Sequence, residues 1–355
     1  MDYPVIHIVK RFGRVGGMES YVWHLTHGLA DRGVEIVIVC ERVCELPAES
    51  MRIIQVEASP ERPRWKSMIV FRHRVEQRIR REFRGQSVLI HSHERSLSHQ
   101  VTTFHGPPIE SPKWFGWLSR LNRRVSAWQQ LERDELLRPN VQMLLPVSSQ
   151  IRDALMSRYP EILHKQIELA WPGVEAPATV DIQKRDLPQL TGLRFGFVGR
   201  EWKRKGLDIA VRVVEEFRKV SPNSTLTVFG VSSEELPRAM RESDWIIPRG
   251  WVAQVPWSEF DLLLHPARNE PFGMVVPEAR RYGTPLVMSS AVGAADLEFS
   301  DTEVVDISAR VSEWCIAVQK VVNAASGTPE VKWTWDDLVH LHCQTIYPKL
   351  EANQL

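Results

Sequence analysis

Two glutamates lie close together where a polar loop joins a predicted strand to a predicted helix. Asp261–His265 is apolar enough for a buried strand, and the pattern over Val276–Tyr282 predicts a helix. Glu270 falls in the loop and Glu278 on the helix. The first backbone N–H groups of a helix have no partner inside it, so they can hold phosphate oxygens. One carboxylate can then bind the sugar, and the other the ribose, of a single ligand that lies along the helix start.

A cationic turn precedes Glu270 by 65 to 70 residues. Gly199–Gly206 follows a strand-like run, leads into a helix and holds four Lys or Arg within six residues. Positive charge is disfavoured at the start of a helix. A bound diphosphate would offset this cost by forming charge-assisted hydrogen bonds with two of these cations. The turn therefore predicts a diphosphate site, although a solvated basic turn would carry the same residues.

A glycine-containing turn follows the first strand-like run. Lys10–Glu19 carries the adjacent glycines Gly16 and Gly17, which allow close backbone approach to a ligand at a helix start. The turn lacks the G-x-G-x-x-G spacing, so a nicotinamide or flavin fingerprint is absent. A plain strand-to-helix turn would look similar.

Four histidines fall within 15 residues and suggest a zinc site: His91, His93, His99 and His105. No carboxylate or cysteine completes a convincing set of ligands, and histidines are common at strand ends. We therefore expect no metal here, and a hydrogen-bonded loop histidine is the alternative interpretation of His105.

The elements that must position these residues alternate along the chain. In the first half, strands are predicted at Val5–Val9, Glu35–Cys40, Arg52–Val56, Ser87–His91, Val101–Phe104, Gln142–Val147 and Gln166–Trp171. In the second half, they are predicted at Leu193–Gly199, Thr225–Gly230, Trp245–Ile247, Asp261–His265 and Pro285–Ser289. Helical patterns lie between them, at Met18–Ala30, Ile151–Arg158, Leu207–Val220, Val276–Tyr282 and Ala309–Asn323. Such alternation predicts parallel sheets covered by helices on both faces.

Pro172–Gly192 interrupts the alternation and is interpreted as a linker between two domains. Trp333–Leu350 is helical by pattern and lies outside the second strand series. We expect an α/β fold of two doubly wound, Rossmann-like domains that face each other across a cleft. The first domain comprises residues 1–172 and 336–355, and the second comprises residues 173–335.

The composition limits the class of protein. The 355 residues are 43% hydrophobic and 25% charged, and the formal net charge is +1, which does not favour nucleic-acid binding. No run of about 18 apolar residues would span a membrane, and no secretory signal peptide is evident at the start. The four scattered cysteines are expected to be reduced, half-buried thiols. These features favour a cytoplasmic protein.

Positive charge is concentrated in the first half of the chain. Residues 1–170 hold 25 Lys or Arg and 19 Asp or Glu, and Arg62–Arg84 alone holds nine basic residues and two glutamates. That segment and Ser111–Arg124 combine basic with apolar or aromatic residues, a pattern typical of contact with an anionic membrane or a phosphorylated acceptor. The residues predicted to make this contact are Arg72, Arg78, Trp114, Trp117, Arg123 and Arg124. For Arg62–Arg84 alone, a helix packed on its own sheet with a solvated basic face is the simpler interpretation.

Taken together, these motifs resemble the retaining nucleotide-sugar glycosyltransferases of family 4, which have the GT-B fold. The resemblance includes Gly16–Glu19, Thr103–His105, Pro146–Ser149, Pro172–Val174, the Gly199–Gly206 loop, the Glu270/Glu278 pair, Gly283–Pro285 and the terminal Trp335…Tyr347 segment. Within the family, the chain looks most like the cell-envelope branch that includes lipopolysaccharide-core glucosyltransferases. The resemblance implies that the terminal helix crosses back to the first domain.

The resemblance also implies roles for individual residues. Arg200 and Lys205 match the cations that hold the donor diphosphate, and Glu270 matches the carboxylate that binds the donor sugar. The residues matching the amides at the helix start are Phe272, Gly273, Met274 and Val275. Glu278 matches the ribose-binding carboxylate.

In the first domain, Gly16 and Gly17 match the turn that packs against the donor phosphates. His105 matches the histidine near the reacting sugar, so the resemblance makes His105 and Glu270 the catalytic residues. Closure of the cleft would bring His105 and Gly17 to the donor. The family needs no metal or other cofactor, and a UDP-sugar is expected ahead of a GDP-sugar.

Two stretches depart from the family pattern. Val292–Asp296 lacks the usual pair of glycines and later glutamate, which leaves the sugar preference open. Ser92–Gln100 looks shorter than is common, which leaves the acceptor side open.

The sequence thus predicts a metal-independent glycosyltransferase that transfers a sugar from a nucleotide-diphosphate donor to a glycan or glycolipid of the bacterial cell envelope, such as lipopolysaccharide core. It would act at the cytoplasmic face of the inner membrane. Two alternatives stay open. A nucleotide-sugar epimerase of the same fold would turn over donor without acceptor, and a non-catalytic membrane- or RNA-binding module would lose no function on Glu270→Ala.

Overall fold

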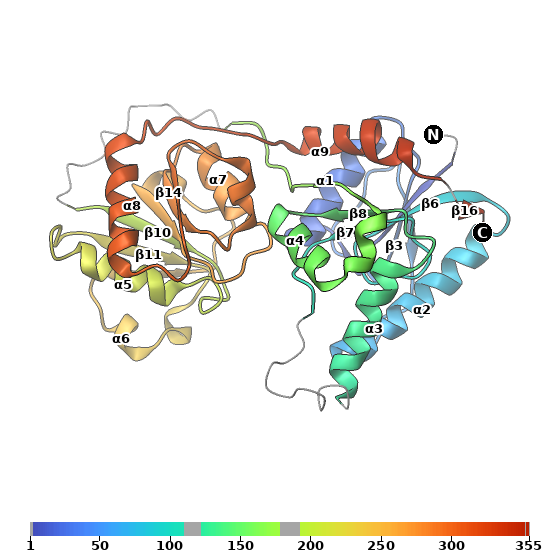
Figure 1. Cartoon of the computed structure of the whole chain (residues 1–355), viewed down its shortest axis with the longest axis horizontal. Coiled ribbons are helices and arrows are strands. Elements are labelled where there is room, and N and C mark those ends of the chain that lie inside the picture. Colours follow the sequence, from blue (N-terminus) through green and yellow to red (C-terminus); the bar gives the residue numbers. More distant parts are fainter. Residues whose placement is uncertain (1–2, 110–121, 178–191, 352, 355) are drawn as a thin grey trace. The chain divides into compact units, whose positions relative to one another are not determined.

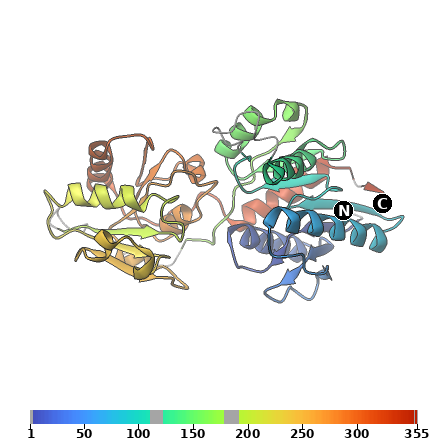
Figure 2. The same ribbon diagram turned by 90° about the horizontal axis from the view of Figure 1, so that it is seen from below.

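The computed structural model describes residues 3–109, 122–177, 192–351 and 353–354. The chain divides into two compact units. Unit 1 comprises Met1–Gly173 and Trp335–Leu355, and unit 2 comprises Val174–Thr334. In each unit, helices cover a parallel sheet (Figures 1 and 2), which confirms the α/β prediction of two Rossmann-like domains.

Unit 1 is built on a sheet in the order β5-β3-β1-β6-β7-β8-β9, and β16 pairs with β6 in the antiparallel direction. Its strands are β1 Val5–Ile8, β3 Ile36–Cys40, β5 Arg52–Gln55, β6 Ser87–Ser92, β7 Val101–Phe104, β8 Met143–Pro146, β9 Gln166–Ile167 and β16 Asn353–Gln354, with a separate pair of β2 Arg11–Phe12 and β4 Arg42–Val43. Its helices are α1 Gly17–Asp31, α2 Arg64–Glu82, α3 Arg123–Leu137, α4 Ser149–Arg158 and α9 Trp335–Leu341.

The two faces of the unit 1 sheet have different chemistry. Side chains alternate between faces along a strand, and Ile6 and Ile8 lie on the face where Phe71 and Val75 of α2 complete an apolar core. His7 therefore lies on the opposite face, and the register places it beside His91 of β6. The face covered by α2 is thus largely apolar, with buried Thr102 bonded to Glu135 of α3, whereas the opposite face carries a group of buried histidines.

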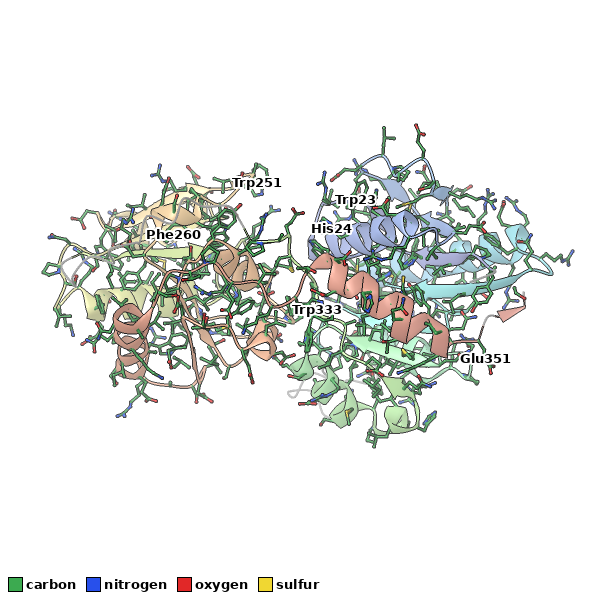
Figure 3. All side chains as sticks on the ribbon, turned by 90° about the horizontal axis from the view of Figure 1, so that it is seen from above. Trp23, His24, Trp251, Phe260, Trp333 and Glu351 are labelled. Carbon is green, nitrogen blue, oxygen red and sulfur yellow. The ribbon has the colours of Figure 1, made fainter. Side chains whose placement is uncertain are left out.

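The terminal segment packs on unit 1, as the sequence predicts. Arg32 of α1 forms an ion pair with Asp336 of α9, and a Cβ atom on Gly28 would lie 2.5 Å from Val339. Figure 1 shows α9 running beside α1, and Figure 3 labels His24 of α1, whose ring stacks on Trp335 at 4.3 Å between centroids.

The helical pattern predicted over Trp333–Leu350 is confirmed for most of that stretch, but the segment is not a single α-helix. The α-helix ends at Leu341, a π-helical turn covers His342–Ile346, and a 3-10 turn covers Tyr347–Lys349. Pro348 has no backbone N–H and cannot continue an α-helix. The change in helical geometry places Tyr347 in the interior, where it is fully buried.

Unit 2 holds a parallel sheet in the order β12-β11-β10-β13-β14-β15. Its strands are β10 Arg194–Val198, β11 Thr225–Phe229, β12 Ile246–Gly250, β13 Leu262–His265, β14 Leu286–Ser289 and β15 Thr302–Val305. Its helices are α5 Leu207–Phe217, α6 Arg238–Arg241, α7 Val275–Arg281 and α8 Val311–Ala324. Apolar residues of α5, α8 and the strands, including Val213, Trp314 and Phe197, form its core.

Some boundaries and elements differ from the sequence prediction. The strand expected over Gln166–Trp171 covers only Gln166–Ile167, and α3 and β15 were not predicted. All four cysteines are free, with Cys40 buried and the other three half-buried. Among the described residues, no helix combines the length and apolar character that crossing a bilayer requires.

Candidate active site

The predicted donor residues meet at one place in the unit 2 sheet. From β10 the strand order runs outward in both directions, to β11 and β12 on one side and to β13, β14 and β15 on the other. Loops at the carboxyl ends of two such central strands diverge and leave a crevice in which α/β proteins bind ligands. The cationic turn follows β10 and the Glu270 loop follows β13, so the topology brings them together.

A buried carboxylate with two cations forms the centre of this site. Lys205 Nζ lies 3.0 Å, and Arg204 Nη1 3.1 Å, from the same oxygen of Glu270, Oε2. Arg204 Nη1 also donates to the carbonyl oxygen of Asn269 at 2.6 Å, which ties the two loops together. Because both cations contact Oε2, Oε1 can accept a further hydrogen bond.

Glycines allow the loops to approach each other this closely. Gly206 has a φ of +78°, and a Cβ atom there would lie 1.9 Å from the carbonyl oxygen of Pro266. Gly273 has a φ of +95°, and its Cβ would lie 3.1 Å from Cγ of Glu270. Both positions require left-handed backbone that glycine adopts without strain. The side chain of Lys205 crosses Gly199, where an added Cβ would lie 2.2 Å from Cδ of the lysine.

The loop after β14 supports the backbone of Glu270. Glu270 N donates to Ala291 O at 3.0 Å, and Gly293 N donates to Glu270 O at 3.0 Å. This is the loop that departs from the family pattern at Val292–Asp296, so the departure lies directly against the carboxylate that the sequence predicts to bind the donor sugar.

The remaining predicted donor residues surround this centre. Arg200 is exposed, and its guanidinium makes no ion pair within the described ranges. Phe272, Gly273, Met274 and Val275 form the turn that enters α7. Glu278, in the first turn of α7, is half-buried, and burial raises the pKa of its carboxyl to about 7 despite nearby Lys205 and Arg281.

Sequence reasoning missed two residues of this site. Arg204 contacts Glu270, although the prediction chose Arg200 and Lys205 from the same turn. His265 ends β13, is fully buried, and neither ring nitrogen has a partner among the described residues. Burial, followed by the nearby cations Lys205 and Arg204, lowers the pKa of His265 well below its usual value, so the ring is neutral. The sequence signal that could have identified His265 is its position at the end of a strand, directly before the loop of Glu270.

Unit 1 has an equivalent position at the carboxyl ends of β1 and β6, where the strand order also diverges. The Gly16–Gly17 turn begins α1 there. A Cβ atom on Gly16 would lie 2.5 Å from Oε2 of Glu19, whereas Gly17 faces open space. Glu19 is buried and accepts from Nε of Arg11 at 2.9 Å. Glu94, which was not predicted, accepts from the backbone N–H of Lys10 at 3.3 Å, and burial raises its pKa to about 7.

His105 follows β7 on the polar face of the unit 1 sheet. Its Nε2 lies 3.3 Å from Nδ1 of His93, and its ring packs edge-on against Tyr21 at 5.0 Å between centroids. Burial lowers the pKa of His105 to about 3, so the ring is neutral at physiological pH. It can therefore exchange hydrogen bonds with a sugar hydroxyl but brings no positive charge.

The histidines that lie together in the structure differ from the four that are close in the sequence. His7 joins His91 and His93, and one ring nitrogen from each lies within 4.8 Å of the others. His99 lies apart, hydrogen-bonded to Ser96 and to the carbonyl oxygen of Glu135. His7 is 84 residues from His91 in the chain, and only the pairing of β1 with β6 brings them together.

The basic segment of unit 1 is partly structural. Arg72 does not face solvent: its side chain is 12% exposed and its Nη1 contacts Asp134 Oδ2 of α3 at 2.8 Å. The prediction that Arg72 touches a membrane or acceptor is therefore corrected, because this arginine joins α2 to α3. Arg123 and Arg124 are exposed at the start of α3. Trp114 and Trp117 lie outside the described residues.

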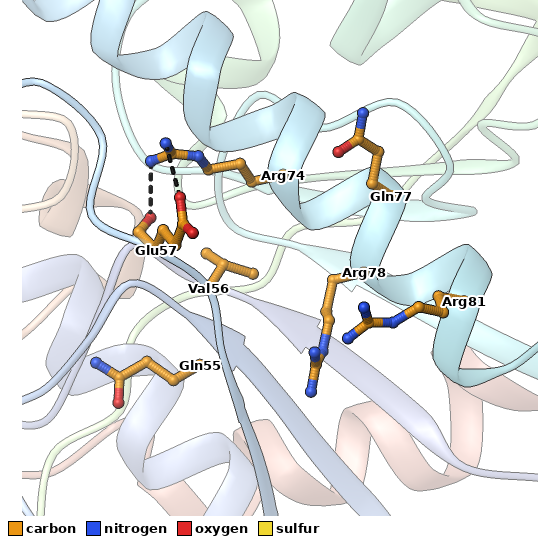
Figure 4. Close-up of a pocket in the computed structure, with 7 residues that line it drawn as sticks. All are labelled: Gln55, Val56, Glu57, Arg74, Gln77, Arg78 and Arg81. Atoms are coloured by element: carbon orange, nitrogen blue, oxygen red, sulfur yellow. Dashed lines mark hydrogen bonds and ion pairs between the residues drawn. The ribbon is translucent and has the colours of Figure 1, made fainter.

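Arg78 lines a groove of about 480 Å³ between β5 and α2 (Figure 4). The groove is lined by Gln55, Val56, Glu57, Arg74, Gln77, Arg78 and Arg81. Arg74 is fixed by Glu57 Oε2 at 3.0 Å, and both Arg78 and Arg81 share Glu82 at 3.1 and 3.9 Å. Three arginines on one helix face thus give the groove an excess of positive charge.

Comparison with known proteins finds two glycosyltransferase domains. The family model described as Glycosyltransferase Family 4 matches residues 15–176, and that described as Glycosyl transferases group 1 matches residues 192–323. A glycogen synthase of Mycobacterium tuberculosis is 25% identical over 241 residues, which are 59% of this chain and 53% of that protein. The chain therefore spans about half the length of that relative. A D-inositol 3-phosphate glycosyltransferase of Paenarthrobacter aurescens is 25% identical over 346 residues, covering 86% of this chain and 84% of its own.

Solved structures share the fold over almost the whole chain. WaaG, described as a glycosyltransferase involved in lipopolysaccharide biosynthesis, has a TM-score of 0.71 at 16% identity and covers 97% of this chain and 96% of its own. Anabaena Alr3699/HepE in complex with UDP and glucose has a TM-score of 0.62 at 15% identity and covers 97% of this chain and 99% of its own.

Proposed function

We propose that this chain, which matches two glycosyltransferase family models and shares the GT-B fold, transfers a sugar from a nucleotide-diphosphate donor to a glycan or glycolipid of the bacterial cell envelope, such as lipopolysaccharide core. A UDP-sugar is the proposed donor ahead of a GDP-sugar. The structures of HepE with UDP and UDP-glucose support a nucleoside diphosphate donor, as does that of starch synthase IV bound to ADP.

The single observation that carries this proposal is the Glu270 centre. Lys205 and Arg204 converge on one oxygen of a buried carboxylate at the switch point of the unit 2 sheet. A carboxylate that only neutralised two cations would not need the left-handed glycines that hold its loop in place. A diphosphate offers the oxygens that a cation cluster binds, and the attached sugar offers hydroxyl donors for Oε1.

The same residues can stabilise the departure of the nucleoside diphosphate. In the transfer, the bond between the anomeric carbon and the diphosphate oxygen breaks, and a bond to the acceptor oxygen forms. Negative charge grows on the leaving group, and Lys205, Arg204 and Arg200 would be fixed cations at that position, without a metal. Preorganised groups of this kind typically contribute about 3–4 kcal/mol each to lowering a barrier.

We propose that the anomeric configuration is retained. The acceptor hydroxyl then attacks on the face from which the diphosphate leaves, and a phosphate oxygen takes its proton. Glu278 would bind the ribose, and neutral His105 would hold a sugar hydroxyl. The groove of Arg74, Arg78 and Arg81 is the proposed contact for anionic groups of the acceptor or of the cytoplasmic membrane surface.

Calorimetric titration with UDP, GDP, dTDP and ADP, in buffer with EDTA, tests the donor site. We expect one nucleotide to bind the wild-type chain, and Lys205→Met to weaken its affinity by at least tenfold. Lys219→Met is the matched control, because Lys219 is an exposed lysine of unit 2 paired with Glu216. Equal affinity in wild type and Lys205→Met would refute the assignment, as would binding that depends on added Mg²⁺.

A further inference from the structure

Six buried or half-buried side chains of unit 1 form one continuous series of hydrogen-bond contacts. They come from β1, β6, β7, the residues after these strands, and the terminal segment beside α1 (Figure 1). In order along the series they are His105, His93, His7, Tyr347, His91 and Thr103. The catalytic role proposed for His105 does not account for the other five, four of which are 0–1% exposed.

In the facing pairs of this series, a ring nitrogen of one imidazole points toward a ring nitrogen of the next. His7 Nδ1 and His93 Nε2 are 3.1 Å apart, while their ring centroids are 5.4 Å apart and the rings are within 11° of parallel. The centroid separation exceeds the nitrogen separation by about two ring radii, so the nitrogens lie on the line between the rings. His93 and His105 have the same in-line nitrogens, with 3.3 Å between nitrogens and 5.6 Å between centroids, although their rings are tilted by 38°.

The in-line orientation of the facing nitrogens of His7 and His93 fits a hydrogen bond and not two ligands of one metal ion. Zinc lies about 2.0–2.1 Å from an imidazole nitrogen. A metal between His7 and His93 would have to lie near the midpoint of 3.1 Å, which is too close to both nitrogens. One nitrogen of each facing pair must therefore carry a proton.

The buried rings are neutral, which fixes how many protons they hold. Burial lowers the pKa of His7 and His105 to about 3, and lowers those of His91 and His93 well below the usual value. A neutral imidazole donates with one nitrogen and accepts with the other. The series therefore has a single direction, and the direction at one position sets the tautomer of every ring.

Tyr347 provides the asymmetry that sets the direction. Its hydroxyl carries one proton and contacts His91 Nδ1 at 2.9 Å and His7 Nε2 at 3.3 Å. Bonds donated by a hydroxyl are shorter than those donated by N–H, so Tyr347 donates to His91 and accepts from His7. His91 Nε2–H then donates to Thr103 Oγ1 at 2.8 Å.

We infer that Tyr347, His7 and His93 are positioning residues that hold His105 as its Nε2–H tautomer, with Nδ1 as a hydrogen-bond acceptor. Following the direction from Tyr347, His7 accepts at Nδ1 from His93, and His93 accepts at Nδ1 from His105. All four rings are then Nε2–H tautomers. The opposite direction would make all four Nδ1–H tautomers.

The functional consequence rests on the proposed function. An unprotonated Nδ1 on His105 accepts a hydrogen bond from a sugar hydroxyl and rejects a group that can only accept. The terminal segment would thus influence the reacting end of unit 1 through Tyr347, without contact with the substrate.

The tautomers of the resting protein test the inference directly. In the full-length chain labelled with ¹⁵N-histidine, the ring nitrogen shifts distinguish Nε2–H from Nδ1–H, and single His→Gln variants assign the signals. We expect Nε2–H at His7, His91, His93 and His105. Nδ1–H at any of the four overturns the inference, and so does one equivalent of zinc that stays bound after dialysis. Because no turnover is involved, failure of the proposed function would leave this result unaffected.

Tyr347→Phe then tests the role of the hydroxyl. We expect the His7, His93 and His105 signals to show both tautomers, and kcat to fall by roughly 10-fold to 100-fold with an unchanged KM for the donor. His342→Phe is the matched control, since His342 is fully buried beside Tyr347 and its one hydrogen bond among the described residues is to the carbonyl oxygen of Leu338. An unchanged His105 tautomer in Tyr347→Phe, or the same change in His342→Phe, would refute the role of Tyr347.

Discussion

Replacing Glu278 with glutamine should stabilise the empty protein while removing its response to donor. Burial raises the pKa of the Glu278 carboxyl from 4.5 to about 7. The folded state therefore holds this proton to higher pH than the unfolded chain does, so the free energy of unfolding falls as pH rises from 4.5 through 7. Above pH 7 the folded protein therefore contains a half-buried, ionised Glu278 carboxylate, which lowers its stability until a ligand binds this group.

The size of the effect follows from the separation between the two pKa values. Each pKa unit between the folded and unfolded states is worth about 1.4 kcal/mol, so at pH 8 the raised pKa of Glu278 lowers the free energy of unfolding by on the order of 3 kcal/mol. Because Glu278 is half-buried and solvent screens part of the interaction, we expect about 1–3 kcal/mol. At pH 5 the same shift lowers the free energy of unfolding by less than about 1 kcal/mol, because Glu278 is protonated in the folded state.

Thermal unfolding at pH 8 and pH 5, with and without nucleotide, measures this effect. Glu278→Gln should raise the melting temperature by several degrees at pH 8, show a much smaller rise at pH 5, and lose the stabilisation by nucleotide that the wild type shows. Glu259→Gln is the control, because it removes the same charge from an exposed position in unit 2. A lower melting temperature for Glu278→Gln at pH 8, or equal shifts at the two pH values, would refute the reasoning.

Three further predictions concern other parts of the site. Gly206→Ala should lower the free energy of unfolding by about 2 kcal/mol or more and abolish nucleotide binding, because the added methyl group would meet the carbonyl oxygen of Pro266. Gly250→Ala is the control, because Gly250 has a similar φ but open space around it. In urea unfolding, this control should show only the smaller cost of backbone strain. Arg78→Gln with Arg81→Gln should weaken binding to vesicles of anionic lipid by about 30-fold, at about 1 kcal/mol for each charge, as measured by co-sedimentation. The rate should show no titration of His105 between pH 5 and 8, since its pKa is about 3; an inflection near pH 6.5 that His105→Gln removes would contradict this.

The vesicle experiment needs its own matched pair. Arg238 and Arg241 lie on α6 of unit 2 and are exposed, so replacing both with glutamine removes the same charge elsewhere. Equal losses in the two double variants would show that only the total charge matters, and the groove would then not be the site of contact.

The fold was predictable because its signals are local. The β-branched run Ile36–Cys40 and the apolar spacing of Met68, Phe71, Val75 and Ile79 each specify one element without reference to the rest of the chain. α3 was missed although Asn122 caps it by accepting from Arg124 N at 3.1 Å. Its amphipathic pattern is no weaker than that of α4, which was predicted, but the basic and aromatic residues before it were interpreted as a membrane contact.

The candidate site was predictable as a pair of loops but not in its contacts. The Glu270 loop and the cationic turn were found because each follows a strand and carries charge that the local structure does not need, whereas the choice of Lys205 within the turn came from the family resemblance. The choice between Arg200 and Arg204 depends on which side chain of one turn points toward β13, and spacing does not specify this. Arg72 was assigned to the surface because α3, which covers it, was not predicted.

The series through His7 and Tyr347 lies beyond sequence reasoning for a different reason. Alternation places His91 and His93 on one face of a strand, and Thr103 and His105 on one face of the next. The order of strands in the sheet, which brings His7 beside His91, is a property of the whole domain. Tyr347 reaches them from the 3-10 turn near the other end of the chain, 256 residues after His91.

Transfer itself is the central claim, and one incubation tests it. The chain is mixed with a UDP-sugar and a lipopolysaccharide-core acceptor in EDTA, and both the released UDP and the mass of the acceptor are measured. We predict that the acceptor gains one sugar for each UDP released, and that Glu270→Gln lowers both by at least 100-fold, about 3 kcal/mol of barrier. Consumption of the UDP-sugar without a gain in acceptor mass, or equal rates in wild type and Glu270→Gln, would contradict the account.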